Sequence, residues 1–325
     1  MKTSVKLMIV AATITTVTIL SCKKERMSPT PTQGTTQNLS ALFEQKAAPK
    51  QTFTIDANQY QTITGAKGTI LNIQPGSFKN LSGQVATGNV TIELREIYSK
   101  ADMIFSKAPT VSNEKLLVSG GELFIQAFQN GSSLYLASSN SISAMVPAIN
   151  PGPMKEFYVN WSSWQGEEWQ SLNWQSPEAF NDSIILIDDT TNFDSTNYVY
   201  PTYYYFNIDG LNWINCDYFY DSPGPFTDIE VVVPPAFSGA NCEVFVSFDG
   251  LNSVAGLADY DVNHSFEAYS NFPQGLNVHI VAIANINGQY YSAFVPATLS
   301  ANFSTNITLT ATTMSQIIAD VNALP

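Results

Sequence analysis

The stretch "ADYDVNHS" places three oxygen-bearing side chains at alternating positions, Asp259, Asp261 and Asn263. Hard oxygen ligands at this spacing open the calcium loop of an EF-hand. Such a loop then requires a glycine and, at its twelfth position, a glutamate, whereas this chain has His264 and Ser270 there. The spacing therefore leaves an irregular calcium site as a candidate cofactor site, and a polar hairpin tip is the alternative.

A second stretch, "YVNWSSWQGEEWQSLNW", contains the tryptophans Trp161, Trp164, Trp169 and Trp174. Exposed indole rings can stack on the C–H faces of sugar rings, and the neighbouring Gln and Asn side chains can bond sugar hydroxyls. The stretch is therefore a candidate glycan-binding surface. The favoured alternative is packing, in which the indole rings pin this connection onto a sandwich while Gly166 turns the chain.

Residues suited to catalysis are few. The chain has two histidines, His264 and His279, and it contains no Gly-x-Ser-x-Gly elbow, His-Glu-x-x-His zinc motif or phosphate-binding loop. Adjacent carboxylates such as Glu167 and Glu168 would point to opposite faces of a strand, so they would not converge on a glycosidic bond. The sequence therefore predicts a protein that is not an enzyme, and a hydrolase with carboxylates near His264 is the less favoured alternative.

The N-terminal region predicts export. Lys2 and Lys6 precede an apolar stretch that is too short for a comfortable membrane span, which is typical of a signal peptide over residues 1–21. The sequence Ile19-Leu20-Ser21-Cys22 resembles the lipobox of bacterial lipoproteins, in which the cysteine is lipidated and becomes the first mature residue. The resemblance implies that acyl chains on Cys22 anchor the protein to a lipid bilayer.

Residues 22–50 contain few large apolar side chains, so the sequence predicts a lipidated cysteine followed by a flexible tether. The short amphipathic piece Leu39–Phe43 is the one place where structure would interrupt it. No later stretch is apolar and long enough to span a membrane. The formal net charge of −13 disfavours nucleic acid as a partner, because an acidic surface repels phosphates.

Two cysteines, Cys216 and Cys242, remain beyond Cys22. An even pair in an exported protein indicates a disulfide, which would add roughly 3 kcal/mol of stability in the chain-entropy treatment. Two free, buried thiols are the alternative.

The elements that must position these residues are predicted to be β-strands. In "GNVTIELREIY", Val90, Ile92 and Leu94 share one strand face. The dipeptides Asn130-Gly131 and Asn287-Gly288 each lie between alternating stretches and predict tight hairpins. Helical spacing is convincing in "MSQIIADVNAL", near the end of the chain.

Three stretches, "ITGAKGTILNIQPGSF", "GNVTIELREIYSKADMI" and "VSGGELFIQAF", resemble a β-sandwich module of Bacteroidetes envelope lipoproteins that is similar to the ZU5 domain. The match covers about residues 51–150 and is partial, because Gln74-Pro75-Gly76 stands where ZU5 domains usually have two prolines before the glycine. ZU5 domains mediate protein contacts, so the resemblance implies a scaffolding or interaction role and transfers no site residues.

Exported Bacteroidetes proteins are O-glycosylated at short Asp-Ser/Thr motifs, and "NDSIILIDDTTNFDSTN" is similar at three places. The resemblance implies that Ser183, Thr190 and Ser195 are candidate O-glycosylation sites. Asp, Thr and Asn are also common in ordinary loops, which is the alternative.

Together these features predict an all-β protein with two β-sandwich domains, one ZU5-like and one immunoglobulin-like. The predicted boundaries are a first domain over 51–155, a connecting segment over 156–197 and a C-terminal domain over 198–325. The predicted function is a lipoprotein of the cell envelope, anchored in the outer membrane, that binds or scaffolds an envelope protein or glycan without catalysis. The alternative from another class is a surface glycan-binding protein that uses the tryptophans.

Overall fold

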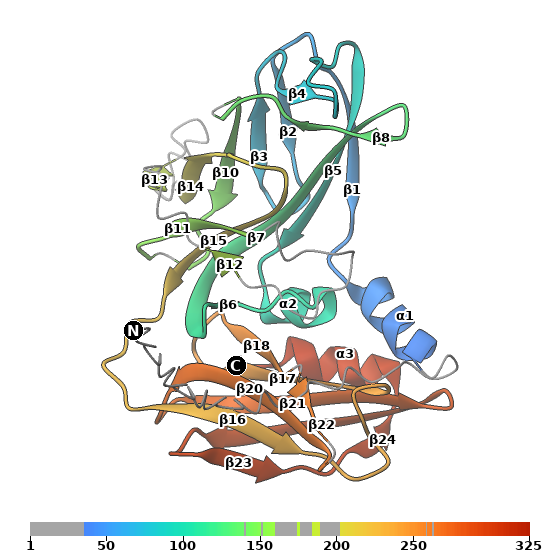
Figure 1. The fold of residues 1–325 in the computed structure, drawn as a ribbon, viewed down its shortest axis with the longest axis vertical. Helices are drawn as coiled ribbons and strands as arrows, with labels where there is room; N and C mark the ends of the chain where they lie inside the picture. The colour runs from blue at the N-terminus through green and yellow to red at the C-terminus, as the bar shows by residue number, and fades with distance from the viewer. Residues whose placement is uncertain are drawn as a thin grey trace, which may run out of the picture.

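The chain folds predominantly into β-strands, as its sequence predicts. The computed structural model describes residues 36–139, 141–150, 152–159, 174–175, 184–188, 202–257, 259–261 and 263–325. Within these ranges the chain forms strands arranged in several sheets and three short helices (Figure 1). The expected all-β class is therefore confirmed.

Two sheets pack face to face to form what we call the first sandwich. One sheet contains β1 (Gln51–Asp56), β5 (Asn89–Ile97), β7 (Lys115–Gln129), β8 (Ser132–Ser133), β11 (Lys155–Val159), β12 (Trp174–Gln175) and β15 (Asn212–Phe219). The facing sheet contains β2 (Gln61–Thr64), β3 (Ile70–Ile73), β10 (Ile142–Pro147), β13 (Ile185–Asp188) and β14 (Thr202–Asn207). Alternate residues of both sheets, including Leu71, Leu94 and Ala144, form a shared core.

Short elements close the two ends of the first sandwich. The strands β4 (Phe78–Lys79) and β9 (Tyr135–Leu136) pair with each other at the end drawn uppermost in Figure 1. At the other end, β6 (Val111–Ser112) pairs with the start of β7. The predicted turn between β7 and β8 is present, because Asn130 and Gly131 both have the positive φ that a tight hairpin requires.

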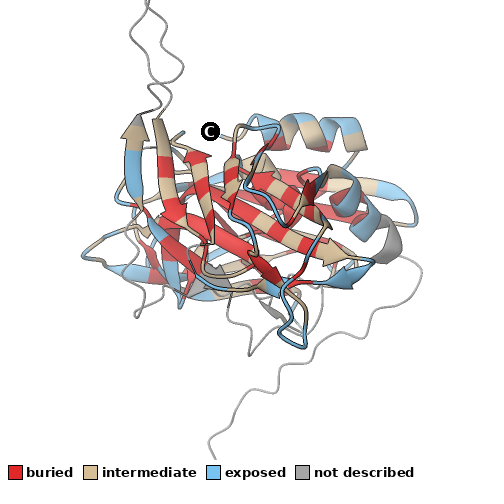
Figure 2. Cartoon of the chain, turned by 90° about the horizontal axis from the view of Figure 1, so that it is seen from above, coloured by how far each residue is buried: buried red, intermediate tan, exposed pale blue. Residues whose placement is uncertain are grey.

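A second sandwich forms from the C-terminal strands. One sheet contains β17 (Cys242–Phe248), β18 (Val254–Leu257), β21 (Asn277–Ile286), β22 (Gln289–Thr298) and β24 (Thr310–Thr312). Opposite it lie β16 (Phe226–Val232), β19 (Asp259–Tyr260), β20 (Ser265–Pro273) and β23 (Phe303–Asn306). Figure 2 shows the buried residues running along the central strands, with exposed residues in the connecting loops.

Three helices fill the space between the sandwiches, and we call them the helix layer. They are α1 (Thr36–Lys46), α2 (Lys100–Ser106) and α3 (Met314–Asn322). Their apolar residues share one buried cluster with residues of both sandwiches, such as Trp213 of β15 and Val281 of β21. None of the helices in the described ranges has the length and apolar character needed to cross a bilayer.

The strand β7 belongs to both sandwiches. Its first residue, Lys115, pairs with Asn271 of β20, and Leu116 is buried in the core of the second sandwich. Farther along, Leu123 and Ile125 are buried in the core of the first sandwich. Between these parts the pairing with β15 shifts register, which re-aims the strand from one sandwich to the other.

The structure moves two predicted boundaries. Residues 36–50, assigned to the tether, include α1, whose Leu42 and Phe43 are almost fully buried in the helix layer. Residues 202–219, assigned to the C-terminal domain, form β14 and β15 of the first sandwich. Local patterns located these strands but could not identify their partners, because pairing depends on residues distant in the sequence.

Candidate functional site

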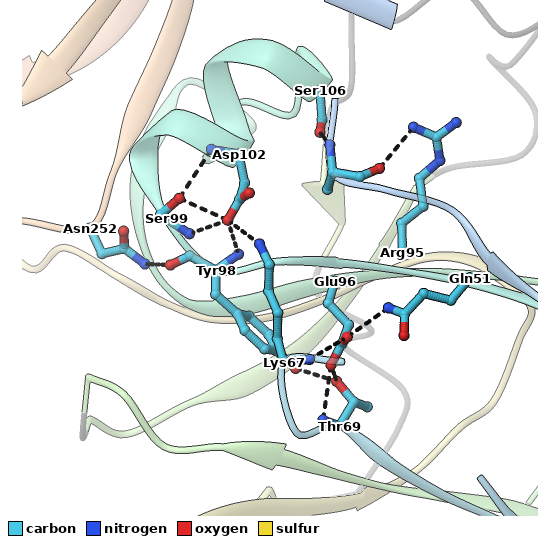
Figure 3. A network of polar contacts seen from close by, with 11 residues as sticks. Gln51, Lys67, Thr69, Arg95, Glu96, Tyr98, Ser99, Asp102, Ser106 and Asn252 are labelled. Atoms are coloured by element: carbon cyan, nitrogen blue, oxygen red, sulfur yellow. Dashed lines mark hydrogen bonds and ion pairs between the residues drawn. The ribbon is translucent and has the colours of Figure 1, made fainter. Parts of the chain in front are cut away.

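The first polar site, drawn in Figure 3, is built around Glu96 of β5. The Glu96 side chain is buried, with 1% exposure. Its Oε1 accepts hydrogen bonds from the backbone N and the Oγ1 of Thr69, at 2.9 and 2.5 Å. Its Oε2 accepts bonds from Nε2 of Gln51 and the backbone N of Lys67, both at 2.8 Å. We call these four residues the Glu96 network. It fixes the loop that precedes β3 onto the sheet, which is a structural role.

The surroundings of Glu96 leave no room for a ligand. A Cβ atom on Gly65 would lie 2.5 Å from the Glu96 carboxyl carbon, so the loop approaches as closely as glycine allows. The hydroxyl of Tyr98 is hydrogen-bonded to Oγ1 of Thr69. Burial raises the pKa of Tyr98 well above its ordinary value, so this phenol is a hydrogen-bonding group and not a base.

Asp102 connects the Glu96 network to α2. The backbone N of Asp102 donates to Oγ of Ser99 at 3.1 Å and the backbone N of Ser99 donates to Oδ2 of Asp102 at 2.9 Å, which together form the capping box of α2. The same Oδ2 also accepts a bond from Oγ of Ser99 at 2.7 Å. Nζ of Lys67 lies 2.6 Å from the same oxygen. Burial alone would raise the pKa of Asp102, but the bonds from Lys67 and Ser99 outweigh it and lower the pKa.

A second polar site consists of Ser119, Glu122, Asn215 and Asp217, each 0% exposed, and we call it the Glu122 cluster. Glu122 of β7 lies opposite Asn215 of β15, whose Nδ2 donates to Oδ2 of Asp217 at 2.6 Å. Neither oxygen of Glu122, nor Oδ1 of Asp217, has a hydrogen-bond partner among the described residues.

Burial governs the ionisation of the Glu122 cluster. Desolvation, followed by the neighbouring Asp217, raises the pKa of Glu122 well above its ordinary value. Desolvation also raises the pKa of Asp217 to about 8. Shifted carboxyl groups of this kind often mark active sites. Here complete burial keeps both groups from any dissolved substrate, so they are not a catalytic pair.

The third site is open to solvent. A cleft of about 870 Å³ lies at the end of the first sandwich where β4 and β9 pair, and we call it the tip cleft. Four separate parts of the chain line it: residues 79–83, 126–127, 133–136 and 209–212. Figure 1 shows this end of the sandwich on the side away from the helix layer.

The tip cleft has an apolar floor and a mixed rim. Leu134 and Leu211 are buried at its base, whereas the ring of Tyr135 is 47% exposed and Leu81 is 85% exposed. The strand pairing places Tyr135 beside Lys79. The rim thus offers an aromatic ring and an aliphatic side chain next to polar groups, which suits binding better than chemistry.

The predicted calcium residues form a turn. Oδ1 of Asp261 accepts bonds from the backbone N of Asn263 and of Ser265, at 2.8 and 3.2 Å, and its Oδ2 accepts from Nδ2 of Asn263. Asp259 pairs with Glu267 in β19 and β20. Within the described ranges no three His, Cys, Asp or Glu residues gather as a metal site would require. Calcium therefore stays a prediction.

Both histidines bond to a neighbouring side chain. Nδ1 of His264 is 2.5 Å from the hydroxyl of Tyr260, and Nδ1 of His279 is 2.8 Å from Oδ1 of Asp249. Neither contact includes a nucleophilic serine or cysteine. The histidines thus stabilise a turn and a strand end in the second sandwich.

The predicted disulfide is wrong. Cys216 and Cys242 are both free and buried. Cys216 lies in the core of the first sandwich and Cys242 in that of the second, so the two thiols do not meet. Burial raises the pKa of both thiols, which makes them poor nucleophiles. The even count of cysteines could not reveal that each packs in a different core.

Several candidate residues lie outside the described ranges. They are Cys22, the tryptophans Trp161, Trp164 and Trp169, and the glycosylation candidates Ser183, Thr190 and Ser195. Of the fourth tryptophan, Trp174 of β12, the structure describes the backbone, which pairs with Val159 of β11. Lipidation, the tryptophan surface and O-glycosylation therefore stay predictions.

Sequence reasoning missed the tip cleft and the Glu122 cluster. Four segments far apart in the sequence form the cleft, so no local motif could have found it. Glu122 and Asp217 did leave a signal, because each is a carboxylic acid that lies next to large apolar or aromatic residues within a strand. No protein-family model and no curated protein matches the sequence of this chain.

Proposed function

We propose that this protein is a lipid-anchored binding protein of the cell envelope that holds its ligand in the tip cleft without transforming it. The observation that carries the proposal is the contrast between the open cleft and the buried acids. The carboxyl groups with strongly shifted pKa values are fully enclosed, whereas the cleft that a ligand can enter is lined by polar, aliphatic and aromatic groups.

The titratable groups of the cleft support a non-catalytic role. Lys79, Tyr135 and Asp209 are the residues of this kind among those that line it, and the lining contains no histidine or cysteine. General acid–base catalysis needs a proton donor and acceptor whose pKa values lie near the working pH. A cleft with these groups is better suited to orienting a ligand by contact.

The position of the cleft fits an anchored protein. The lipobox-like cysteine, Cys22, precedes α1, and α1 joins the body at the helix layer. The tip cleft lies where β4 and β9 pair. Figure 1 shows β4 at the end of the first sandwich away from the helix layer. An anchor at Cys22 would therefore leave the cleft facing away from the part of the body that the anchor enters.

Hydrogen exchange on the full lipidated chain tests the binding role. We expect solubilised envelope extract from the expressing cells to protect the peptides that contain residues 79–83, 133–136 and 209–212, with no change over β22. Ser133→Arg should abolish the protection, because Ser133 is exposed and lines the cleft. Ser132→Arg is the matched control, since Ser132 is also exposed but lies outside the lining. Extract that leaves the cleft peptides unprotected would refute the role.

Fractionation tests the anchor separately. Cys22→Ala should move the protein from the membrane fraction to the soluble fraction, because the residue that carries the acyl chains is lost. Cys216→Ala is the control, because that thiol is buried in the first core and should leave membrane association unchanged. A Cys22→Ala protein that stays with membranes would contradict the lipid anchor.

A further inference from the structure

We propose that the ligand of the tip cleft is a neutral oligosaccharide. This inference rests on the proposed binding function and names the chemical class of its ligand. Three properties of the lining residues support it, namely the apolar surface that they expose, the hydrogen-bonding groups that they carry and the small number of charges among them.

The exposed apolar surface of the cleft is small and includes one aromatic ring. Tyr135 is 47% exposed on β9, and Leu81 is 85% exposed in the turn after β4. The face of a pyranose ring carries C–H groups that pack against an aromatic ring, while its hydroxyls stay at the edge. A single ring beside polar groups matches a sugar better than a wholly apolar ligand, which would require a larger apolar surface.

Two amide side chains on the rim are held in place by each other. Nε2 of Gln126 donates to Oδ1 of Asn212 at 3.1 Å, so the pair bridges β7 and the start of β15. That bond employs the amide nitrogen of Gln126 and the carbonyl oxygen of Asn212. Each side chain also has a second amide atom, which is an acceptor oxygen in Gln126 and a donor nitrogen in Asn212. A sugar hydroxyl both donates and accepts, so it complements such a pair.

The backbone at Asn212 is strained in a way that suits a binding residue. Its φ is 82°, in the left-handed region that glycine adopts most easily. A glycine would relieve the strain but would remove the amide that bonds to Gln126. Strained backbone of this kind is often found at ligand-binding positions, where the side chain is what the site requires.

The charges of the lining argue for a neutral ligand. One cation, Lys79, and one carboxylate, Asp209, line the cleft. Recognition of a phosphate or sulfate group usually requires several positive groups, and the net charge of −13 on the chain adds repulsion. A cationic ligand would in turn need more than a single carboxylate in a lining that also contains a lysine.

The shape of the cleft also distinguishes a sugar from a peptide. Extended peptides bind by adding a strand to a long open sheet edge. Of the strands that contribute to this cleft, β4 and β9 are two residues long and already paired with each other, and the longer β7 pairs with β5 at the two residues that line it. A volume of about 870 Å³ lies within the usual range for small-ligand sites, roughly 300–1,000 Å³, and accommodates several linked sugar rings.

An array of short neutral gluco-, manno- and xylo-oligosaccharides, with sulfated sugars and peptides alongside, tests the inference on the full chain. We expect neutral sugars to bind and the sulfated sugars and peptides not to bind. Titration with the best-bound neutral sugar should show at least a tenfold loss of affinity for Tyr135→Ala, because the stacking ring is removed. Asn212→Gly, which keeps the backbone conformation and deletes the amide, should lose about tenfold.

Two matched variants control for general effects of the substitutions. Tyr135→Phe keeps the ring and should bind within about threefold of the wild type. Tyr269→Ala removes an equally exposed tyrosine, 49% against 47%, from the second sandwich and should bind normally. Equal melting temperatures would establish that each variant is folded.

Several outcomes would overturn the inference. They are a wild-type chain that binds no neutral sugar, a preference for sulfated sugars or peptides, and sugar binding that survives Tyr135→Ala. The last result would move the sugar site to another part of the chain. If the array is blank while envelope extract still protects the cleft peptides, the ligand class is wrong and the binding function stands. If both are negative, both proposals fail.

Discussion

Two buried glutamates on adjacent strands have opposite environments. Glu96 of β5 is cross-strand partner to Leu123, and Glu122 of β7 is partner to Ile97, so the two acids occupy successive rows of the same sheet. Both are at most 1% exposed. Glu96 accepts four hydrogen bonds, whereas neither oxygen of Glu122 has a partner among the described residues.

The difference follows from the face of the sheet on which each side chain lies. The Glu96 side is covered by the loop around Thr69, whose backbone N–H groups point at the carboxylate. The Glu122 side is covered by the helix layer and by Asn215, which gives its own bond to Asp217. Burial alone therefore does not determine what a carboxyl group does. The number of hydrogen-bond donors that face a buried carboxyl group determines whether that group stabilises the fold as a carboxylate or stays protonated.

The largest expected effect is at Glu96. We expect Glu96→Gln to lower the free energy of unfolding by about 3 kcal/mol, because an amide nitrogen would replace an acceptor that faces N–H and O–H donors. Urea denaturation at pH 7 measures the change. A loss below about 1 kcal/mol would mean that the four bonds contribute little, and the contrast with Glu122 would disappear.

Asp217 should make stability depend on pH. Its pKa is raised from 3.8 to about 8, so between these values the folded state holds a proton that the unfolded state releases. The free energy of unfolding should therefore fall as pH rises through this window, by at most about 1.4 kcal/mol per pH unit from this group. Below pH 4 both states are protonated and the effect vanishes.

Asp217→Asn removes this titration. The variant should gain about 2.5 kcal/mol relative to the wild type when the pH is raised from 5 to 7, since asparagine does not ionise. Denaturation curves at the two pH values give the comparison. Parallel pH profiles for the two proteins would show that Asp217 is ionised in the folded state, contrary to its burial.

Glu122→Gln provides the matched partner of the Glu96 substitution. At pH 5 we expect the free energy of unfolding to change by less than about 1 kcal/mol, because a protonated acid without partners is replaced by an amide of the same shape. The same urea measurement applies. A loss as large as that of Glu96→Gln would reveal a partner for Glu122 that the described residues do not include.

The smallest expected effects are at two surface lysines, of which Lys67 belongs to the Glu96 network and extends its ammonium group to Asp102. Lys67→Met should cost about 0.5–1 kcal/mol, because its bond to Asp102 is partly open to solvent. Lys50→Met, which breaks the more exposed pair with Glu93, should cost less. Both losses should shrink in high salt, and salt-independent losses would point to packing of the lysine stems instead.

The local pattern of the sequence predicted much of this fold. The alternation in β5 placed Val90, Ile92 and Leu94 in the core, and both Asn-Gly turns form hairpins. The predicted C-terminal helix is α3. Each of these features depends on neighbouring residues, so a single sequence is sufficient to find them.

Features that depend on distant pairing were not predictable in this way. The strand β15 was assigned to the wrong sandwich because its partners, β7 and β11, lie far away in the sequence. Leu42 and Phe43 were assigned to a tether because their burial depends on α2 and the second sandwich. The tip cleft could not be predicted because four segments far apart in the sequence line it. The separate cores of Cys216 and Cys242 likewise depend on contacts between distant residues.

The shared strand β7 has a consequence for how such proteins can be rebuilt. Lys115 pairs with β20 and Leu116 packs in the second core, although both belong to a strand of the first half, so the second half does not contain all the residues that its own sheet and core need. A cut in the connection after β15 would separate the second half from a residue that its interior needs. The two halves are therefore not independent domains. A recombinant protein that replaces one half with a foreign domain would have to keep the start of β7, because the second core includes it.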